Sequence, residues 1–195
     1  VLLEKIAAEK AQLIKEKKIK KQKPLPPITE DEKPFKLPEG WEWCLFGDVL
    51  FNRDAERIPL SVSDRRTRQG PYDYYGASGV IDGIDNYLFD KPLLLIGEDG
   101  ANLINRSTPI AFIAKGKYWV NNHAHVLDGL TLNLLEYACL HINAINLISY
   151  ITGTAQPKMN QAKMNGIVLA IPPESEQHRI VAKVDQLMTL CDQLK

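Results

Sequence analysis

The sequence predicts an α+β protein: a globular domain of short mixed strands and helices, with a helical segment at the N-terminus and a long amphipathic helix at the C-terminus. Three observations favour this class. Short apolar runs such as residues 93–96 are typical of buried strands. Two longer segments, 132–151 and 180–194, space their apolar residues as a helix does. Hydrophobic residues make up 45% and charged residues 25% of the chain, which excludes a disordered or collagen-like protein.

The first segment, residues 1–23, is predicted to be helical from Leu2 to Lys21 because it is rich in Ala, Glu, Lys, Leu and Gln. A helix of this length needs a partner for its apolar side chains. It is consistent with a surface helix or with one strand of a coiled coil, and the amphipathic helix at the other end of the chain favours the coiled coil. The apolar face, interrupted by Lys10, consists of Leu3, Ile6, Leu13 and Ile14.

Charge is divided unevenly between this segment and the remainder. Residues 1–23 hold eight Lys and three Glu, a balance of +5, whereas the other 172 residues hold sixteen Lys or Arg and twenty-one Asp or Glu, a balance of −5. A nucleic-acid-binding face is normally basic. Charge alone therefore does not predict that the body binds DNA.

Residues 24–36 predict a stiff Pro-rich linker, since proline fixes φ and removes backbone donors. The globular domain is expected to span residues 37–172 and to be loop-rich at 52–88 and 152–165. Lys115 and Gly116 are expected to form a hairpin turn. The expected strands are 93–96, 110–114, 117–120, 126–127 and 166–171, and a helix is expected over 132–151.

Residues 173–195 predict the start of a long helix. Pro173 and Glu174 suit a first turn. The apolar residues that follow are spaced four, three, four and three apart, which is a heptad seam for packing against a partner helix, and the pattern still runs at Lys195, so we expect a truncated helix. The seam consists of Ile180, Val184, Leu187, Cys191 and Leu194.

Catalytic and metal-binding motifs are missing from the sequence, which therefore predicts a non-catalytic chain without a metal site. Phosphate-binding and nucleophile-elbow patterns do not occur, and Ser78 is expected in a turn. His123 and His125 give two imidazoles where zinc needs three or four ligands, so ordinary hydrogen bonding is favoured. Glu98 and Asp99 are expected to form turns or hydrogen bonds. Three cysteines at unrelated spacings fit reduced thiols in a cytoplasmic protein.

Two polar clusters and one pair of lysines are the candidate binding residues. Arginine makes bidentate contacts with guanine or phosphate, glutamine reads adenine, and tyrosine hydroxyls reach phosphate oxygens. By themselves the clusters are also consistent with solvated loops. The candidates are Arg65, Arg66, Arg68, Gln69 and Tyr72 in the first loop, Lys115 and Lys117 beside the turn, and Lys158, Asn160, Gln161 and Lys163 in the second loop.

Several stretches carry a family pattern. The most specific runs from Pro172 to Ile180 and enters the heptad helix, and the next is the proline-bounded Gly40-Trp41 entry. The others are residues 13–24, 74–79, 120–127 and 153–161. Together these stretches, which cover nearly the whole chain, resemble one half of the specificity subunit of a type I restriction–modification enzyme.

The resemblance implies a target-recognition domain carried on parts of a helical spacer, with 1–23 and 173–195 as the spacer helices. It implies recognition of one half of a bipartite double-stranded DNA sequence and favours DNA contact by the arginine loop, whereas the choice of contact residues rests on side-chain chemistry. We expect that changing Arg65, Arg66 and Arg68 together to Ala abolishes specific binding. Methylation by modification subunits with S-adenosylmethionine, and cleavage by a restriction or motor subunit with ATP and Mg²⁺, would lie outside this chain, which would hold no cofactor. A homodimer through the spacer helices is also expected, and the alternative function is a helical oligomerisation or adaptor module.

Overall fold

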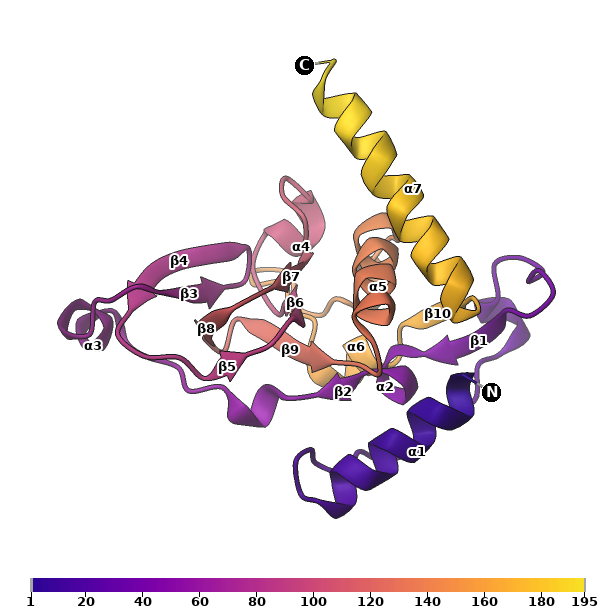
Figure 1. The fold of residues 1–195 in the computed structure, drawn as a ribbon, viewed down its shortest axis with the longest axis horizontal. Helices are drawn as coiled ribbons and strands as arrows, with labels where there is room; N and C mark the ends of the chain where they lie inside the picture. Colours follow the sequence, from indigo (N-terminus) through magenta and orange to yellow (C-terminus); the bar gives the residue numbers. More distant parts are fainter. Residues whose placement is uncertain (1, 195) are drawn as a thin grey trace.

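The computed structural model of the protein describes residues 2–194, which form a mixed α+β body from which one helix projects (Figure 1). The strands of this part of the chain make three sheets. The smallest pairs β1 (Glu42–Leu45) antiparallel with β10 (Val168–Ile171). An antiparallel sheet has the order β2-β9-β6-β7, and a mixed sheet has the order β4-β3-β8-β5, in which β3 and β8 are parallel. Their bounds are β2 (Phe51–Asn52), β3 (Tyr72–Gly76), β4 (Gly79–Ile84), β5 (Phe89–Asp90), β6 (Leu93–Gly97), β7 (Ala111–Ala114), β8 (Lys117–Val120) and β9 (Ala124–Asp128).

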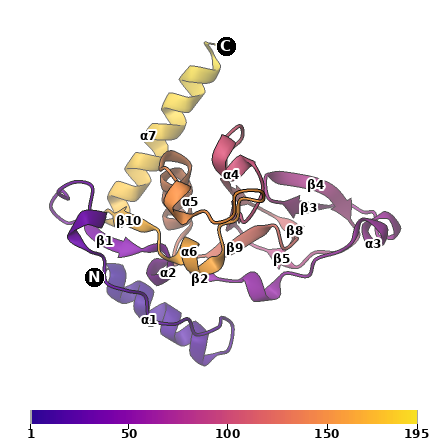
Figure 2. The same cartoon turned by 180° about the vertical axis from the view of Figure 1, so that it is seen from behind.

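The helices lie mainly at the end of the body that holds β1 and β10, as both ribbon views show (Figures 1 and 2). No helix in the described part of the chain is both long and apolar enough to cross a membrane. The helices are α1 (Leu2–Lys15), α2 (Phe46–Val49), α3 (Val62–Thr67), α4 (Asn102–Asn105), α5 (Leu132–Ala144), α6 (Gln161–Asn165) and α7 (Glu174–Asp192), with 3₁₀ turns η1 (Glu30–Glu32), η2 (Asp54–Glu56) and η3 (Ile148–Tyr150).

Strand β6 explains why residues 93–96 are uninterruptedly apolar. Its side chains alternate between two cores, because successive residues of a strand point to opposite faces. Leu94 and Ile96 pack into the main core with α5, whereas Leu93 and Leu95 pack into a second core between the two four-stranded sheets. A strand buried on both faces needs no polar residue, so the predicted buried strand is confirmed.

Helix α1 ends at Lys15, six residues before the predicted end. Lys17 adopts a left-handed conformation with φ of 58°, and the Lys18 amide donates to the Leu13 carbonyl at 2.9 Å, which closes the helix. The sequence has no glycine at this point that would predict the end of the helix. The partner of the helix is the body itself, because Ile6 is buried in the main core. The expectation of a coiled-coil strand at this end was therefore wrong.

Helix α5 ends at Ala144 rather than Ile151. The Arg106 guanidinium Nη2 donates to the carbonyls of Ile142, Asn143 and Ile145, at 3.1, 2.8 and 3.3 Å, and so occupies the end of the helix. The Asn143 side chain accepts from the amides of Ile110 and Ala111 and ties the last turn to β7. Long-range polar contacts of this kind stop a helix although its apolar periodicity continues.

The region 52–88 holds more regular structure than predicted. Strands β3 and β4 form an antiparallel hairpin in the mixed sheet, and α3 precedes it. The expected hairpin around Gly116 was also wrong. Gly116 does turn the chain, with φ of 77°, but β7 pairs with β6 in one sheet while β8 pairs with β3 and β5 in the other. The turn therefore carries the chain from one layer to the next.

The sequence motif that opens α7 has a structural explanation. Pro172 is buried, and Gln177 is also buried and donates from Nε2 to the Pro172 carbonyl at 2.9 Å. Gly40, left-handed at φ of 82°, lies against Pro173, where a Cβ would come within 3.5 Å of the Pro173 ring. The start of α7 is thus fixed against β10 and the entry to β1, which sets the direction of the helix.

Candidate nucleic-acid interface

The arginine cluster lies at the far end of the body from β1, on and after α3 (Figure 1). Helix α3 begins at a capping box in which Ser61 Oγ accepts from the Asp64 amide at 3.1 Å. Arg65 donates from Nε to Asp82 Oδ2 at 2.8 Å and from Nη1 to the Leu60 carbonyl at 3.0 Å. Its guanidinium also lies 4.9 Å from the centre of the Tyr74 ring. Arg65 therefore fastens α3 to the β3–β4 hairpin, and only 14% of its side chain is exposed.

Two further members of the cluster lie at the surface but are engaged in contacts within the protein. Arg68 donates from Nη2 to Asp85 Oδ1 at 2.8 Å and covers the Trp119 ring at 5.0 Å. Gln69 Nε2 donates to the Arg65 carbonyl and to Asp82 Oδ1. Hydrogen bonds from Arg65, Gln69 and the Gly83 amide lower the pKa of Asp82. The chemical type of these residues suits DNA, but their donors already serve the fold.

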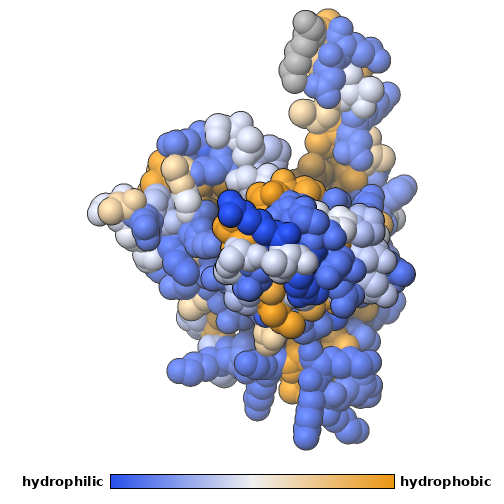
Figure 3. All heavy atoms as spheres, turned by 90° about the vertical axis from the view of Figure 1, so that its left-hand side faces the viewer, coloured by the Kyte–Doolittle hydropathy of each residue, from blue (hydrophilic) through white to orange (hydrophobic). Residues whose placement is uncertain are grey.

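Arg66 differs from its neighbours. Its side chain is exposed, and within residues 2–194 it makes no hydrogen bond or ion pair. Nearby in the mixed sheet, Tyr72 packs edge-on against Tyr87 at 5.2 Å, and Lys117 places its ammonium 4.8 Å from the centre of the same Tyr87 ring. Lys115 is separated from Lys117 by the sheet change and lies 3.9 Å from Glu136 of α5. The surface around α3 is mostly hydrophilic, as Figure 3 shows from that side.

The second cluster surrounds the loop that leads into α6. Lys158 pairs in both directions with Thr152 through backbone hydrogen bonds of 2.8 Å, and its ammonium contacts Glu98 at 3.0 Å. Asn160 caps α6, because its Oδ1 accepts from the Lys163 amide at 3.0 Å. Gln161 and Lys163 on α6 are exposed, and within the described chain neither side chain has a hydrogen bond or ion pair. The structure thus separates this cluster from the α3 cluster rather than bringing the two together.

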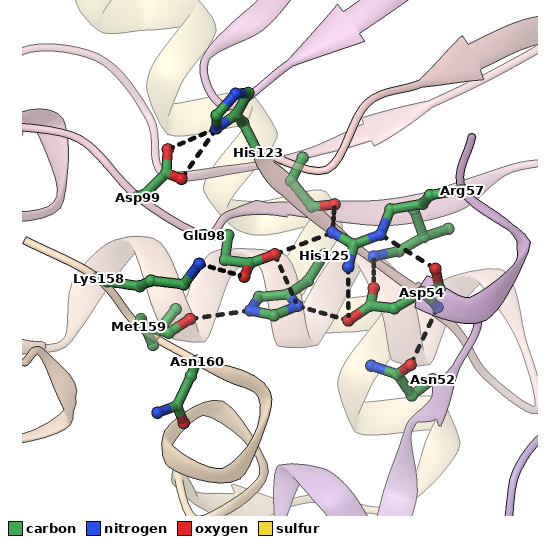
Figure 4. A network of polar contacts seen from close by, with 12 residues as sticks. Asn52, Asp54, Arg57, Glu98, Asp99, His123, His125, Lys158, Met159 and Asn160 are labelled. Atoms are coloured by element: carbon green, nitrogen blue, oxygen red, sulfur yellow. Dashed lines mark hydrogen bonds and ion pairs between the residues drawn. The ribbon is translucent and has the colours of Figure 1, made fainter. Parts of the chain in front are cut away.

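A buried polar network lies beneath this loop (Figure 4). His125, 1% exposed in β9, faces Asp54 Oδ2 at 2.7 Å through Nδ1 and the Met159 carbonyl at 2.9 Å through Nε2. Arg57 donates from Nη1 to Glu98 Oε2 at 2.9 Å and to the Ala124 carbonyl at 2.6 Å. The network joins η2, the end of β6, the start of β9 and the loop before α6.

The contacts of His125 favour an imidazolium. Each ring nitrogen faces an oxygen that has no proton to give, so both nitrogens donate. Burial disfavours this charge, but the bonds to Asp54 and the Met159 carbonyl, together with the nearby Glu98, outweigh it and raise the pKa of His125. Burial likewise opposes ionisation of Asp54, but the bond to His125 outweighs it and lowers the Asp54 pKa. The network is therefore a set of balanced ionic charges.

The role of Asp54 and Arg57 was missed by sequence reasoning, because both lie about 70 residues from His125 along the chain. The expected hydrogen-bonding role of His123, His125, Glu98 and Asp99 is confirmed. His123 pairs separately with Asp99 at 2.9 Å and points away from His125 (Figure 4). The two histidines therefore do not share a ligand set.

The described residues offer little catalytic chemistry. Within residues 2–194 no group of three or more His, Cys, Asp or Glu side chains is arranged to hold a metal ion. Burial raises the pKa of the Cys44 thiol to about 12 and that of Cys139 to about 11, so neither forms a thiolate at neutral pH.

The first half of the α7 heptad seam packs on the body, and the second half is exposed. Val181 is buried, and Ile180 is partly buried against the main core, where the first half of the helix packs on α5. Farther along, the helix leaves the body (Figures 1 and 2) and its apolar residues become exposed. Leu187 is 47% exposed and Leu194 88%.

The described residues form a mixed α+β body with polar loops, from which a helix with an apolar seam extends. The family described as the type I restriction modification DNA specificity domain matches residues 38–195. The chain belongs to this family.

Similar proteins agree with this assignment. The specificity subunit of the type I restriction enzyme EcoAI of Escherichia coli is 33% identical over 218 residues, covering 100% of this chain and 36% of that protein. The EcoEI specificity subunit of Escherichia coli is 29% identical, with the same coverage. The chain thus spans about a third of the length of these relatives.

Solved structures share the fold. A chain from a study of complex assembly and conformational transition of the type I restriction–modification system superposes with a TM-score of 0.63, at 13% identity, over 99% of this chain and 49% of that one. The type I S subunit of M. genitalium gives a TM-score of 0.58 at 14% identity, over 82% of this chain and 42% of that subunit.

Proposed function

We propose that the chain is the sequence-reading part of a type I specificity subunit and recognises one half of a bipartite target in double-stranded DNA. The match of the specificity-domain family to residues 38–195 carries this proposal. Two separate polar surfaces support it, because α3 and β8 offer Arg66 and Lys117, and α6 offers Gln161 and Lys163, all with exposed side chains. The division between engaged and exposed members of the two clusters selects these four as the DNA contacts to test first.

The reaction chemistry would belong to other chains. The proposal assigns methylation to modification subunits that bind S-adenosylmethionine, and cleavage to a restriction subunit that uses ATP and Mg²⁺, in the cytoplasm. The chain itself would be non-catalytic. Its buried Cys44 thiol and the pairing of the network acids with His125 and Arg57 support a binding role.

The exposed half of the α7 seam would pack against a second spacer helix, or against a second copy of the chain in a homodimer. Leu187, Cys191 and Leu194 continue the heptad spacing of Ile180 and Val184 but leave the body. A helix keeps such a stripe in water only at a cost of about 25 cal/mol per Å² of apolar surface, so a partner helix stabilises it.

Selection from a random duplex pool tests the proposed function. The chain is mixed with its modification subunit, bound DNA is recovered and sequenced, and the selection is repeated with Arg66→Ala. Enrichment of one short sequence by the wild-type chain, weakened by the substitution, is the expected result. A pool that stays random in the presence of the modification subunit would contradict sequence recognition.

A further inference from the structure

The lysine-rich turn after α1 is fixed to the body, although its sequence suggests a free, solvated tail. Ile19 is only 9% exposed and belongs to the main core. Gln22 donates from Nε2 to the Gly47 carbonyl at 2.6 Å, a carbonyl that also accepts from Lys10 of α1. Two anchors three residues apart thus hold the turn, and the lysines between and after them face outward.

These lysines form one wall of a groove of about 720 Å³. Gln161 and Ala162 of α6 line the groove opposite them, and Asn52 and Asp54 also line it. In both ribbon views α1 lies beneath α2, β2 and α6, which agrees with this placement (Figures 1 and 2). The groove therefore adjoins the second candidate DNA-binding cluster at α6.

The charges in this groove are unequally neutralised. Lys20, Lys21 and Lys23 are exposed, and within residues 2–194 none of them forms an ion pair with a carboxylate. The carboxylate of Asp54 is directed to His125 and Arg57 at 2.7 and 3.4 Å. The side-chain Nδ2 of Asn52 is buried and has no hydrogen-bond partner in the described residues. The groove therefore presents positive charge without an internal counter-ion.

We propose that Lys20, Lys21 and Lys23 bind the phosphates of double-stranded DNA next to the half-site read by the body. This inference rests on the proposed function and extends it to a segment outside the matched specificity domain, which begins at residue 38. Three ammonium groups on one stretch of chain that lines the groove fit a row of phosphates better than one small anion. The N-terminal segment then supplies the positive charge that the body, at −5, lacks.

Such contacts position the protein on DNA and carry no sequence information. They release condensed counter-ions, so the logarithm of the binding constant falls with the logarithm of salt concentration by about 0.9 for each phosphate neutralised. A sequence-independent duplex is therefore the correct probe for them.

The test compares the wild-type chain with Lys20→Gln/Lys21→Gln/Lys23→Gln on a fluorescein-labelled 40-base-pair duplex of random sequence. Binding is measured at several NaCl concentrations. We expect the triple variant to bind more weakly at low salt and to lower the salt slope by about 2 to 3, one contact for each lysine. An unchanged slope, or a wild-type chain that does not bind the duplex at low salt, would overturn the inference.

A matched control removes the same charge elsewhere. Lys5→Gln/Lys36→Gln/Lys183→Gln changes three exposed lysines that do not line the groove. This control is expected to keep the wild-type slope to within about one contact, and an equal loss in both variants would overturn the inference by showing that only net charge matters. Circular dichroism melting of each variant verifies the fold.

Two further results separate this inference from the proposed function. If the wild-type chain selects one sequence from the pool but the lysine variant keeps its salt slope, the inference fails while the function stands. If the slope falls but no sequence is selected, the function fails while the phosphate contact stands. Loss of binding to the modification subunit in the lysine variant, with DNA binding intact, would instead assign the lysines to an acidic protein surface and overturn the inference.

Discussion

Two cationic regions of the chain look alike in sequence and differ in the structure. Around α3, Arg65 and Arg68 are paired with Asp82 and Asp85, and each lies over an aromatic ring. In the turn after α1, Lys20 and Lys21 are exposed and form no ion pair within residues 2–194. Side-chain type tells which ligand a residue suits, but the presence of an internal counter-ion decides whether it is available. Substitution of paired charges should therefore affect stability, and substitution of unpaired charges should affect binding.

The largest effect is expected at His125, the most buried of the paired charges. His125→Leu removes an imidazolium that is bonded on both sides and leaves Asp54 buried with one partner fewer. Removing one member of a buried ion pair costs about 3–5 kcal/mol. We therefore expect urea unfolding to show a loss of that size.

His123→Leu is the matched control for this prediction. His123 also faces an acid, Asp99, but it is 51% exposed, and exposed pairs contribute less than about 1 kcal/mol. Equal losses in the two variants would contradict the contrast between buried and exposed pairs.

The second-largest loss of stability is expected on substitution of Arg65. Arg65→Ala removes the bond to Asp82, the bond to the Leu60 carbonyl and the contact with the Tyr74 ring. Because these contacts fasten α3 to the β3–β4 hairpin, we expect a lower Tm and faster proteolysis within 57–70. Arg65→Lys should restore only part of the stability, since lysine lacks the planar fork. A Tm equal to wild type in both variants would show that α3 is held by other contacts.

Substitution of the neighbouring Arg66 should weaken DNA binding and leave stability unchanged. Arg66→Ala is expected to leave the free energy of unfolding within about 0.5 kcal/mol of wild type, as for other exposed substitutions. If the side chain reads a base, the selected duplex should bind about 1–3 kcal/mol more weakly. Fluorescence anisotropy on the selected sequence measures this loss of affinity. Arg106 is unsuitable as a control substitution, because it caps α5 and its loss would affect the fold. Unaltered affinity would remove Arg66 from the interface.

This contrast changes how the combined substitution of Arg65, Arg66 and Arg68 should be judged. Its loss of DNA binding would follow from unfolding of the α3 region as readily as from a lost contact, because two of the three arginines hold the fold. The single substitution at Arg66 is the cleaner test.

Much of the fold could be predicted from local patterns, and the failures share one cause. The buried strand at 93–96 and the C-terminal helix follow from apolar periodicity, which is a local property. The ends of α1 and α5 do not, because they depend on a left-handed Lys17 and on Arg106 reaching across to a distant helix. The hairpin at 72–84 was assigned to a loop, although its tyrosines suit a strand.

The candidate site was predictable in composition but not in geometry. Sequence reasoning located the two polar clusters, yet the acids that neutralise Arg65 and Arg68 lie 17 residues farther along the chain. Likewise, the +5 charge of the first segment was evident, but its docking beside α6 depends on Ile19 and on the Gln22 contact with Gly47. Contacts between distant segments decide both outcomes, and no local pattern records them.

The smallest expected effect is a dependence of the unfolding free energy on pH, which arises from the buried charges of the network. The pKa of His125 is raised in the folded chain, so its charge contributes stability that is fully present below the pKa of an unfolded histidine, about 6.5, and is lost as pH rises through the folded value. Asp54 and Glu98 have lowered pKa values, so their contribution is lost only as pH falls below that of an ordinary carboxyl. The network should thus be strongest at about pH 5 to 6.5.

His141 opposes this trend, because burial lowers its pKa and favours the folded state above pH 6.5. The difference between the wild-type chain and His125→Gln cancels the contribution of His141 and isolates the network. We expect this difference in unfolding free energy to be largest at pH 5.5 and to shrink by about 1.4 kcal/mol for each unit by which folding raises the pKa of His125. A difference that is constant from pH 5.5 to pH 9 would mean that folding leaves the pKa of His125 unchanged, and a difference that grows as pH rises through about 6.5 would mean that His125 is neutral when folded.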